Sequence, residues 1–304
     1  MRIGLSGGAA SAERMVEQAV RAESEGFSSL WYASAIGGDP LVAIAFAGKA
    51  TTAIELGTSV LQTYTCHPVL QANRAASVAA GMGRAGFTLG LRPSHQPNIE
   101  HTFGLSYAHP GRHTEEYVRV LSPILRGESV EFHGDDFDIV LAGPVHPLPH
   151  PVSLMISALA PRMLRVAGEL TDGTILWMAN ARAVETHVAP RINRAATAAG
   201  RPAPRVVCGL PIAVTDDADE ARNVAAQVFA GYGVLPNYRR ILDIGGADGP
   251  GDAAIVGNEA EVTEQLTALA DAGVTDFWAA PFPVGADKRA GRQRTRDLLR
   301  SLLP

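Results

Sequence analysis

The residues best suited to chemistry lie just past the fourth strand-like run of the chain. Arg92-Pro93-Ser94-His95-Gln96 follows the apolar run 87–91. An imidazole titrates near neutral pH, so His95 is the candidate for proton transfer at the carboxyl end of a strand, where barrel enzymes build their sites. A loop histidine that only hydrogen-bonds its own segment fits the same pattern.

A second candidate site is the turn between the fifth strand-like run and the next helix. Small residues, Ala158-Leu159-Ala160, precede Pro161, which suits the first position of a helix. A backbone without bulk leaves the amides at a helix N-terminus open to a phosphate, and Gly173 lets a second backbone approach the same side. The alternative is a capped helix without a ligand, and phosphate in barrels usually binds after strands seven and eight.

Other chemistries find little support. The glycines of 4–8 do not have G-x-G-x-x-G spacing, which argues against a dinucleotide site. His146 and His150 lie in a Pro-rich loop and no histidine has a ligand spacing on a predicted helix, so we expect no metal. Cys66 and Cys208 are the only cysteines, which excludes a disulfide framework and paired Cys-x-x-Cys chemistry. No serine or cysteine has a nucleophile-elbow sequence.

Repeated βα units must position these residues. Short apolar runs alternate with segments of helical spacing. The runs are Ile3 to Ser6, Leu30 to Ala33, Ile54 to Val60, Phe87 to Leu91, Val152 to Ser157, Thr174 to Met178, Val206 to Val214 and Thr275 to Ala280. Helical segments are followed by Gly26, Gly86, Gly200 and Gly273, as left-handed caps are. We therefore predict a (β/α)8 TIM barrel, an α/β fold, as a single domain over residues 1–304.

Two insertions are expected in this barrel, a long loop at 93–110 after strand four and a Gly-rich excursion at 237–257 before strand eight. Loops of this length are usually functional. Residues 129–140, with Gly134-Asp135 near the middle, predict a β-hairpin between helix four and strand five.

Composition limits the partners and the compartment. Hydrophobic residues make up 46% of the chain, and no apolar run is long enough to span a bilayer. The N-terminus enters a strand without a signal-peptide pattern, so we expect a cytoplasmic protein. The net charge of -5 is spread along the chain without a basic, aromatic-rich block, so neither nucleic acid nor a membrane is an expected partner.

Several motifs together resemble the luciferase-like monooxygenase family, over nearly the whole chain. They are Gly26-Phe27 through Leu30-Trp31, Ile54-Glu55-Leu56-Gly57-Thr58-Ser59-Val60, His67-Pro68 and Ala158-Leu159-Ala160-Pro161. Further motifs resemble an actinobacterial F420-dependent branch of this family. They are Gly90-Leu91, Ser94-His95-Gln96, Phe103-Gly104-Leu105-Ser106 and Ala279-Ala280-Pro281-Phe282. The resemblance implies FMN or F420 with its ring over the barrel mouth and its phosphate at the loops after strands five and six.

The resemblance also implies the residues of the site. Phosphate contacts would fall on Ala158, Leu159, Ala160 and Gly173, and ring contacts on Ser59, Val60, Ser94 and His95. A non-prolyl cis peptide is implied between Ser59 and Val60, and a homodimer through 41–50 and 70–81. Two departures stand out: Ser34-Ala35 replaces the Asp that many F420 enzymes carry after strand two, and the common Ala-Leu-Gly-Pro turn is here Ala-Leu-Ala-Pro.

The function expected from this resemblance is hydride transfer between coenzyme F420 and a small, largely apolar organic substrate. The protein would supply orientation and electrostatics, with Arg92 and Arg162 as candidates to meet the acidic tail of the cofactor. The missing Asp argues against a sugar-phosphate dehydrogenase and favours reduction of an activated double bond or carbonyl. The alternatives are an FMN-dependent monooxygenase and an F420- or flavin-binding protein without turnover.

Overall fold

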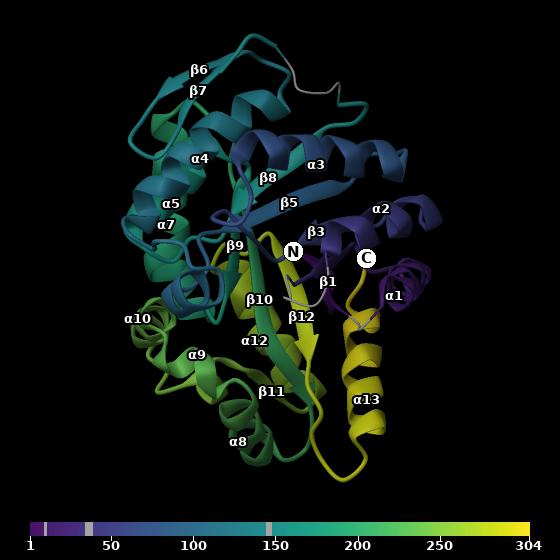
Figure 1. The fold of residues 1–304 in the computed structure, drawn as a ribbon. Helices are drawn as coiled ribbons and strands as arrows, with labels where there is room; N and C mark the ends of the chain where they lie inside the picture. The colour runs from purple at the N-terminus through teal and green to yellow at the C-terminus, as the bar shows by residue number, and fades with distance from the viewer. Residues whose placement is uncertain (9–10, 34–38, 144–147) are drawn as a thin grey trace.

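Parallel strands close into a barrel in the computed structural model, which describes residues 1–8, 11–33, 39–143 and 148–304. β10 pairs with both β9 and β12, and β12 pairs with β1, so the ring of eight strands is closed. In order around the barrel the strands are β1 (Arg2–Gly7), β2 (Ser29–Tyr32), β3 (Glu55–Thr58), β5 (Phe87–Arg92), β8 (Val152–Ile156), β9 (Gly173–Trp177), β10 (Arg205–Val214) and β12 (Asp276–Pro281). The predicted (β/α)8 fold is confirmed (Figure 1).

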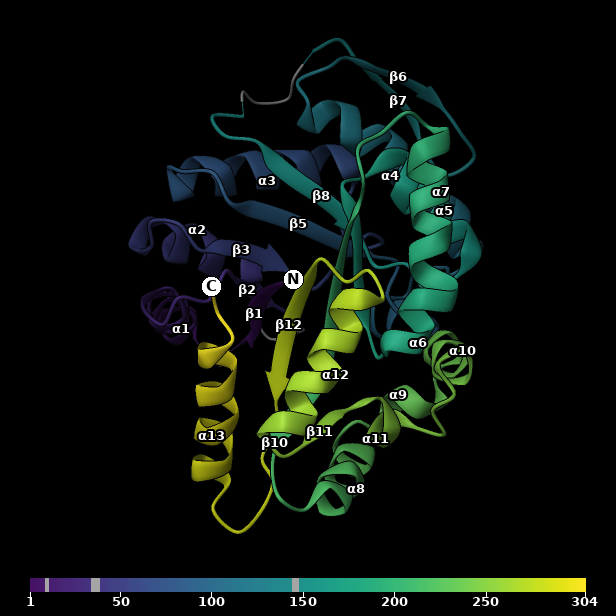
Figure 2. The same cartoon turned by 180° about the vertical axis from the view of Figure 1, so that it is seen from behind.

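Helices cover the outside of the barrel (Figures 1 and 2). They are α1 (Ala12–Ser24), α2 (Pro40–Ala50), α3 (Pro68–Met82), α4 (Pro110–Leu125), α5 (Pro161–Leu170), α6 (Ala181–Ala183), α7 (Ala189–Ala198), α8 (Ala218–Val228), α9 (Ala230–Val234), α10 (Pro236–Gly245), α11 (Pro250–Ala253), α12 (Glu259–Asp271) and α13 (Lys288–Ser301), with the π-helical turns η1 (Asn98–Thr102) and η2 (Val184–Val188). The described part of the chain contains no helix that is long and apolar enough to cross a membrane.

Helix ends follow the local sequence. Ser11 accepts a hydrogen bond from the Arg14 amide at the start of α1, and Asn258 forms a capping box with Glu261 at the start of α12. Each of these caps satisfies an amide that the first turn of a helix leaves free. The glycines expected to cap helices all have positive φ: Gly26, Gly86, Gly200 and Gly273.

The insertions are more structured than the sequence suggested. The loop after β5 contains η1 before α4 begins at Pro110. The predicted hairpin is confirmed as β6 (Val130–His133) and β7 (Asp138–Leu141), which pair in antiparallel fashion. The excursion at 237–257 is corrected, because α10, α11 and the short strand β11 (Ile255–Gly257) occupy it, and β11 extends the sheet beside β10. Figure 2 shows this group beside α12.

The barrel interior is packed rather than hollow. Its apolar layer combines two tryptophans with smaller side chains: Trp31, Val60, Met155, Ile175, Val207 and Trp278. Glycine makes room for the indoles, since a Cβ on Gly57 would lie 2.4 Å from the Trp31 ring and one on Gly209 would lie 1.9 Å from the Trp278 ring. This layer separates a charged N-terminal end of the barrel from the C-terminal mouth.

Candidate active site

The predicted cis peptide is present between Ser59 and Val60. It interrupts the third strand of the barrel, which stops at Thr58 and resumes as β4 (Leu61–Gln62) beside β5. Val60 is buried in the interior cluster that also contains Trp278. The Val60 side chain therefore packs in the interior layer that underlies the barrel mouth.

Ser94 lies two residues past β5 in a left-handed backbone conformation, with φ of 72°. This conformation is unfavourable for a non-glycine residue and persists only where the surroundings fix it. The Tyr107 hydroxyl fixes it here by donating to the Ser94 carbonyl oxygen at 2.7 Å. Met178, directly after β9, also has a positive φ of 64°. Such outliers at the ends of two strands, β5 and β9, which flank β8, point to a functional mouth.

His95 is half-buried beside Arg92, whose Nη1 lies 3.2 Å from His95 Nε2. A guanidinium can only donate, so Nε2 accepts and the proton of the neutral ring is on Nδ1. Burial, and then the charge of Arg92, lower the pKa of His95 to about 4. The ring is therefore neutral at pH 7 and can donate a hydrogen bond, but it is not a reservoir of protons.

The turn before α5 leaves helix amides without a side-chain cap. Ala160 is the N-cap residue, with φ of -87° and ψ of 151°, and its methyl group accepts nothing. The Ala158 amide is already bonded to Thr174 Oγ1, and His187 Nε2 lies 2.8 Å from the Leu159 carbonyl oxygen. His187 was missed from the sequence because it belongs to η2, nearly thirty residues further along. The first-turn amides of α5 are thus the ones free for a phosphate.

Gly173 makes its tightest approach to the backbone of β10. It is the first residue of β9 and pairs with Arg205, the first residue of β10, and with Met155, near the C-terminal end of β8. Its φ is 156°, and a Cβ there would lie 2.1 Å from the Arg205 carbonyl oxygen. The glycine is required by this close approach to β10, and it lies one residue from Thr174, whose Oγ1 accepts from the Ala158 amide.

A family model matches most of the chain. The model of the luciferase-like monooxygenase family matches residues 1–276. The chain belongs to the luciferase-like monooxygenase family. A curated member, 5,10-methylenetetrahydromethanopterin reductase from Methanolobus tindarius, is 27% identical over 305 residues, which cover 90% of this chain and 92% of that protein.

Solved structures from this family share the fold. An F420-dependent secondary alcohol dehydrogenase in complex with an F420-acetone adduct superimposes with a TM-score of 0.77 at 19% identity, covering 98% of this chain and 97% of that one. The oxygenating constituent of 3,6-diketocamphane monooxygenase from Pseudomonas putida, in complex with FMN, gives 0.74 at 17% identity, covering 100% and 98%. At these identities the likeness concerns the fold alone.

Buried polar atoms at the mouth of this luciferase-like barrel lack partners. Among the described residues, no hydrogen-bond partner is found for Ser59 Oγ, Ser94 Oγ, Arg92 Nε, Trp177 Nε1 or Trp278 Nε1. Leaving such a group unpaired costs about 1–3 kcal/mol each. A ring with several polar edge atoms could satisfy them, so the residues present fit a flavin or deazaflavin. The segment Ser34-Ala35, where the family often has an acidic residue, lies outside the described residues.

An aromatic wall faces the mouth, and the local sequence carries little signal for it. Trp177 and Trp278 stack at 5.1 Å between ring centroids, from the two strands that flank β10. Phe229 and Tyr232, near α9, contact Trp177 edge-on. In an eight-stranded barrel β10 is opposite β3, so this wall faces Val60. Bulky apolar residues at the ends of separate strands could have suggested a pocket. Only the fold shows that these side chains lie close together.

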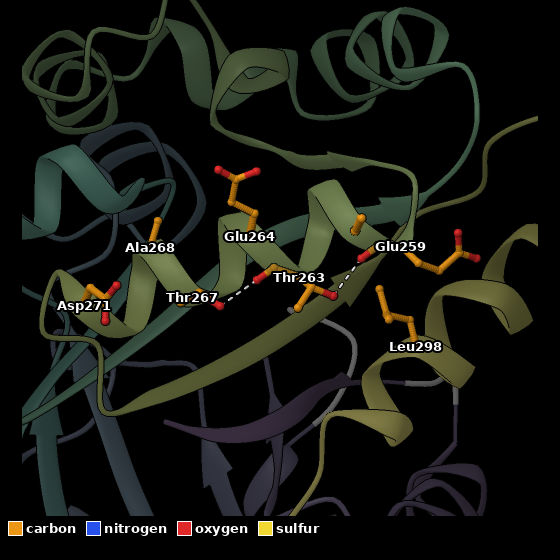
Figure 3. A pocket seen from close by; sticks show the side chains of 8 residues that line it. Glu259, Thr263, Glu264, Thr267, Ala268, Asp271 and Leu298 are labelled. Atoms are coloured by element: carbon orange, nitrogen blue, oxygen red, sulfur yellow. Dashed lines mark hydrogen bonds between the residues drawn. The ribbon is translucent and has the colours of Figure 1, made fainter.

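A groove elsewhere on the surface has a different character. It lies between α12 and α13 and is lined by Glu259, Thr263, Thr267 and Leu298, among others (Figure 3). Its threonine hydroxyls donate to carbonyl oxygens of their own helix, as the Thr267 bond to Thr263 shows. Polar groups here are satisfied locally, so the groove makes no demand for a ligand. No cluster of metal-ligating side chains occurs within the described ranges.

Proposed function

We propose that this protein is an F420-dependent oxidoreductase that transfers a hydride between coenzyme F420 and a small organic substrate. Bound F420 would supply or accept the hydride, and the protein would bind and orient the cofactor and the substrate. The observation that carries the proposal is the group of unpartnered polar atoms beside the Ser59–Val60 bond, at the carboxyl ends of the barrel strands.

The residues present would hold the cofactor in two places. The first-turn amides of α5, next to Ala158, Leu159 and Ala160, would bind its phosphate, because an uncapped helix N-terminus favours an anion. Ser59, Val60, Ser94 and His95 would surround its ring, with two hydroxyls available as donors or acceptors. Gly173 begins the strand whose second residue, Thr174, accepts from the Ala158 amide, so its backbone would border this phosphate site.

F420 is preferred over FMN because of the branch-like motifs around 90–106 and 279–282 and because of the F420-dependent dehydrogenase among the structural neighbours. The FMN-dependent monooxygenase is the second candidate, supported by the FMN complex that has nearly the same TM-score. Both cofactors carry a ring, a ribityl chain and a phosphate, so the cradle described above suits either.

Titration separates these candidates. Two of the three tryptophans, Trp177 and Trp278, are at the mouth, so cofactor binding should quench intrinsic fluorescence. We expect F420 to bind at least as tightly as FMN, and tenfold tighter binding of FMN would overturn the cofactor assignment. Steady-state oxidation of reduced F420 with a panel of enones and ketones then distinguishes an enzyme from a binding protein without turnover.

His95 is proposed as a catalytic residue in its neutral form. With a pKa of about 4 it carries no charge at pH 7, so it would donate a hydrogen bond from Nδ1 to a substrate oxygen rather than deliver a proton from an imidazolium. The proton that completes a reduction would then come from solvent at the mouth. His95→Gln retains a donor and is expected to keep more activity than His95→Ala, measured as kcat of F420 oxidation.

We also propose a single domain that assembles as a homodimer. The barrel takes strands from both ends of the chain, since β1 pairs with β12. Val42, Phe46 and Leu70 expose 52%, 61% and 57% of their surface along a groove between α2 and α3. An apolar face of this kind can pair with its own copy across a two-fold axis.

Sedimentation velocity tests the dimer. The double variant Phe46→Glu with Leu70→Glu should sediment as a monomer. Val228→Glu is the matched control, because Val228 is 57% exposed but lies on α8, outside the groove. A wild-type monomer at micromolar concentration would contradict the proposal.

A further inference from the structure

Arg92 differs from every other partly buried arginine that the structure describes. Those in ion pairs are Arg74, Arg112, Arg201, Arg205, Arg239, Arg294 and Arg296. Arg84 and Arg191 instead donate to backbone carbonyl oxygens. Arg92 makes neither kind of contact within the described ranges: its Nη1 hydrogen-bonds the His95 ring, the Tyr238 hydroxyl is a second hydrogen-bonding neighbour, and its Nε is buried without a partner.

No carboxylate of the chain can complete this site. None of the described Asp or Glu side chains lies within ion-pair distance of Arg92. The residues outside the described ranges, 9–10, 34–38 and 144–147, include no Asp or Glu. The groups that do face the guanidinium are uncharged at pH 7: burial raises the pKa of Tyr107 and of Tyr238 to about 12, and the pKa of His95 is lowered to about 4.

The guanidinium points into the mouth. Gly90, two residues earlier on β5, faces the interior, because a Cβ there would meet Ile175 at 2.4 Å and Val60 at 2.9 Å. Alternate residues of a strand share a face, so Arg92 extends from the same side, one layer nearer the carboxyl end. A partly buried cation with no counterion is costly unless something supplies the missing charge.

We propose that Arg92 binds a carboxylate of the substrate, so that the protein acts on small organic acids with an apolar or aromatic body. The inference deepens the proposed function and rests on it. Arginine suits this role because its planar fork can meet a carboxylate with two parallel hydrogen bonds. The aromatic wall of Trp177 and Trp278, with Tyr238 beside Arg92, would pack against the apolar body.

The same oxyanion chemistry could come from the cofactor, through its phosphate or acidic tail. The substrate is the better assignment because the free amides of α5 are the proposed phosphate site, and Arg92 is surrounded by side chains from α10 and from the insertion after β5. Arg162, the other candidate for the acidic tail, is exposed and engaged by Glu115 at 2.9 Å. Insertions and loops are where members of one fold differ in substrate.

Two ligands of similar shape, one anionic and one neutral, test whether the site binds a carboxylate. Protein saturated with F420 is titrated calorimetrically with benzoate and with acetophenone, which has nearly the same shape but no charge. We expect benzoate to bind at least about tenfold more tightly, the effect of one charge-assisted hydrogen-bonded pair. Arg92→Gln should abolish this preference, Arg92→Lys should keep part of it, and the control Arg162→Gln should keep all of it.

A second titration identifies the source of the anion. Wild type and Arg92→Gln are compared for F420 and for the 8-hydroxy-5-deazaflavin that carries only a ribityl chain. If Arg92→Gln weakens F420 about tenfold, spares the truncated ring and leaves benzoate unchanged, the anion belongs to the cofactor and the substrate assignment is overturned. Equal binding of benzoate and acetophenone to wild type also overturns it. Failure of F420 to bind refutes the proposed cofactor instead, and the benzoate comparison is then made with FMN bound.

Stability distinguishes a ligand-binding arginine from a structural one. Arg92→Gln removes an unpaired cation, so its melting temperature should equal or exceed that of wild type. Arg84→Gln removes a side chain that donates to the carbonyl oxygens of Gly48, Thr51 and Ile54, so it should melt at a lower temperature. A drop for Arg92→Gln as large as that for Arg84→Gln would show a structural role and refute the proposal.

Discussion

The two ends of the barrel treat buried polar groups in opposite ways. At the N-terminal end, Arg2 and Arg205 each pair with both Glu55 and Asp276, and Thr88 donates to Glu55. At the C-terminal mouth, Arg92 has no carboxylate partner and several buried donors have no partner within the described residues. The polar groups of the N-terminal end satisfy one another, whereas we propose that a bound ligand satisfies those of the mouth.

The difference shows that burial of charge is not by itself a sign of function. Burial alone would raise the pKa of Asp276, but hydrogen bonds from Arg205 and its charge hold that pKa below the usual value. The depressed pKa of Asp276 is thus explained by its ion pair with Arg205. This is expected at the N-terminal end of a barrel, which contributes to stability rather than to catalysis. The informative groups are those whose perturbation has no partner to explain it.

The largest expected effect is at the paired end. Arg205→Met should lower the free energy of unfolding by about 3–5 kcal/mol, because it leaves Glu55 and Asp276 with Arg2 as their remaining partner. Since the folded pKa of Asp276 is depressed, its contribution is full above the unfolded pKa of about 3.9 and is lost as pH falls through the folded value. Urea unfolding at pH 7 and pH 3.5 should show the difference between the proteins shrinking at the lower pH. Equal midpoints at pH 7 would contradict the prediction.

The next effect is at the phosphate cradle, where stability and binding should move in opposite directions. Ala160→Asp supplies the missing cap of α5 and should stabilise the fold by about 1 kcal/mol. The same carboxylate should weaken F420 binding about a hundredfold, because like charges in contact cost several kcal/mol. Ala160→Asn is the control, with a similar cap and no charge, and should lose less affinity. If Asp and Asn bind F420 alike, phosphate is not held here.

The adjacent hydroxyl groups of Thr58 and Ser59 allow a matched comparison, in which we expect a smaller effect on stability and binding. Thr58 Oγ1 accepts from the Gly90 amide at 2.8 Å and donates to its carbonyl oxygen at 2.9 Å, whereas Ser59 Oγ has no partner among the described residues. Thr58→Val should cost about 1–3 kcal/mol in unfolding free energy. Ser59→Ala should stay within about 0.5 kcal/mol while weakening cofactor binding about fivefold. Similar stability losses for both variants would remove the contrast.

The smallest effect concerns the titration of His95. Its ring resonances should titrate with a midpoint of about 4. Because burial is the larger cause and Arg92 the smaller, Arg92→Gln should raise that midpoint only in part and leave it below about 6.5, the ordinary value for histidine. Proton NMR, with His95→Gln to assign the signal, measures both. A wild-type midpoint near 6.5 would mean that the mouth is more hydrated than the structure indicates.

Local sequence predicted the fold well because each element is encoded by its neighbours. Alternating apolar runs, helix-ending glycines and the 129–140 hairpin depend on contacts within a few residues. The glycines of the excursion before β12 favour a loop, but its short helical stretches form because they gain their stability from packing on the barrel. The Ser59–Val60 cis bond came from family resemblance alone, since nothing in the local residues requires it.

The sequence by itself determined the periodicity that closes a barrel, and it placed Ser94 and His95 at the end of a strand. Only the tertiary structure decided which polar groups have partners. Gly173 is sixteen residues from Ser157 along the chain, and only the register of β8 with β9, which pairs Gly173 with Met155, brings it beside the end of β8. Arg92 is one arginine among many in the sequence. It becomes distinctive only when every nearby carboxylate proves to lie beyond ion-pair distance, because pairing depends on positions in space that sequence separation does not record.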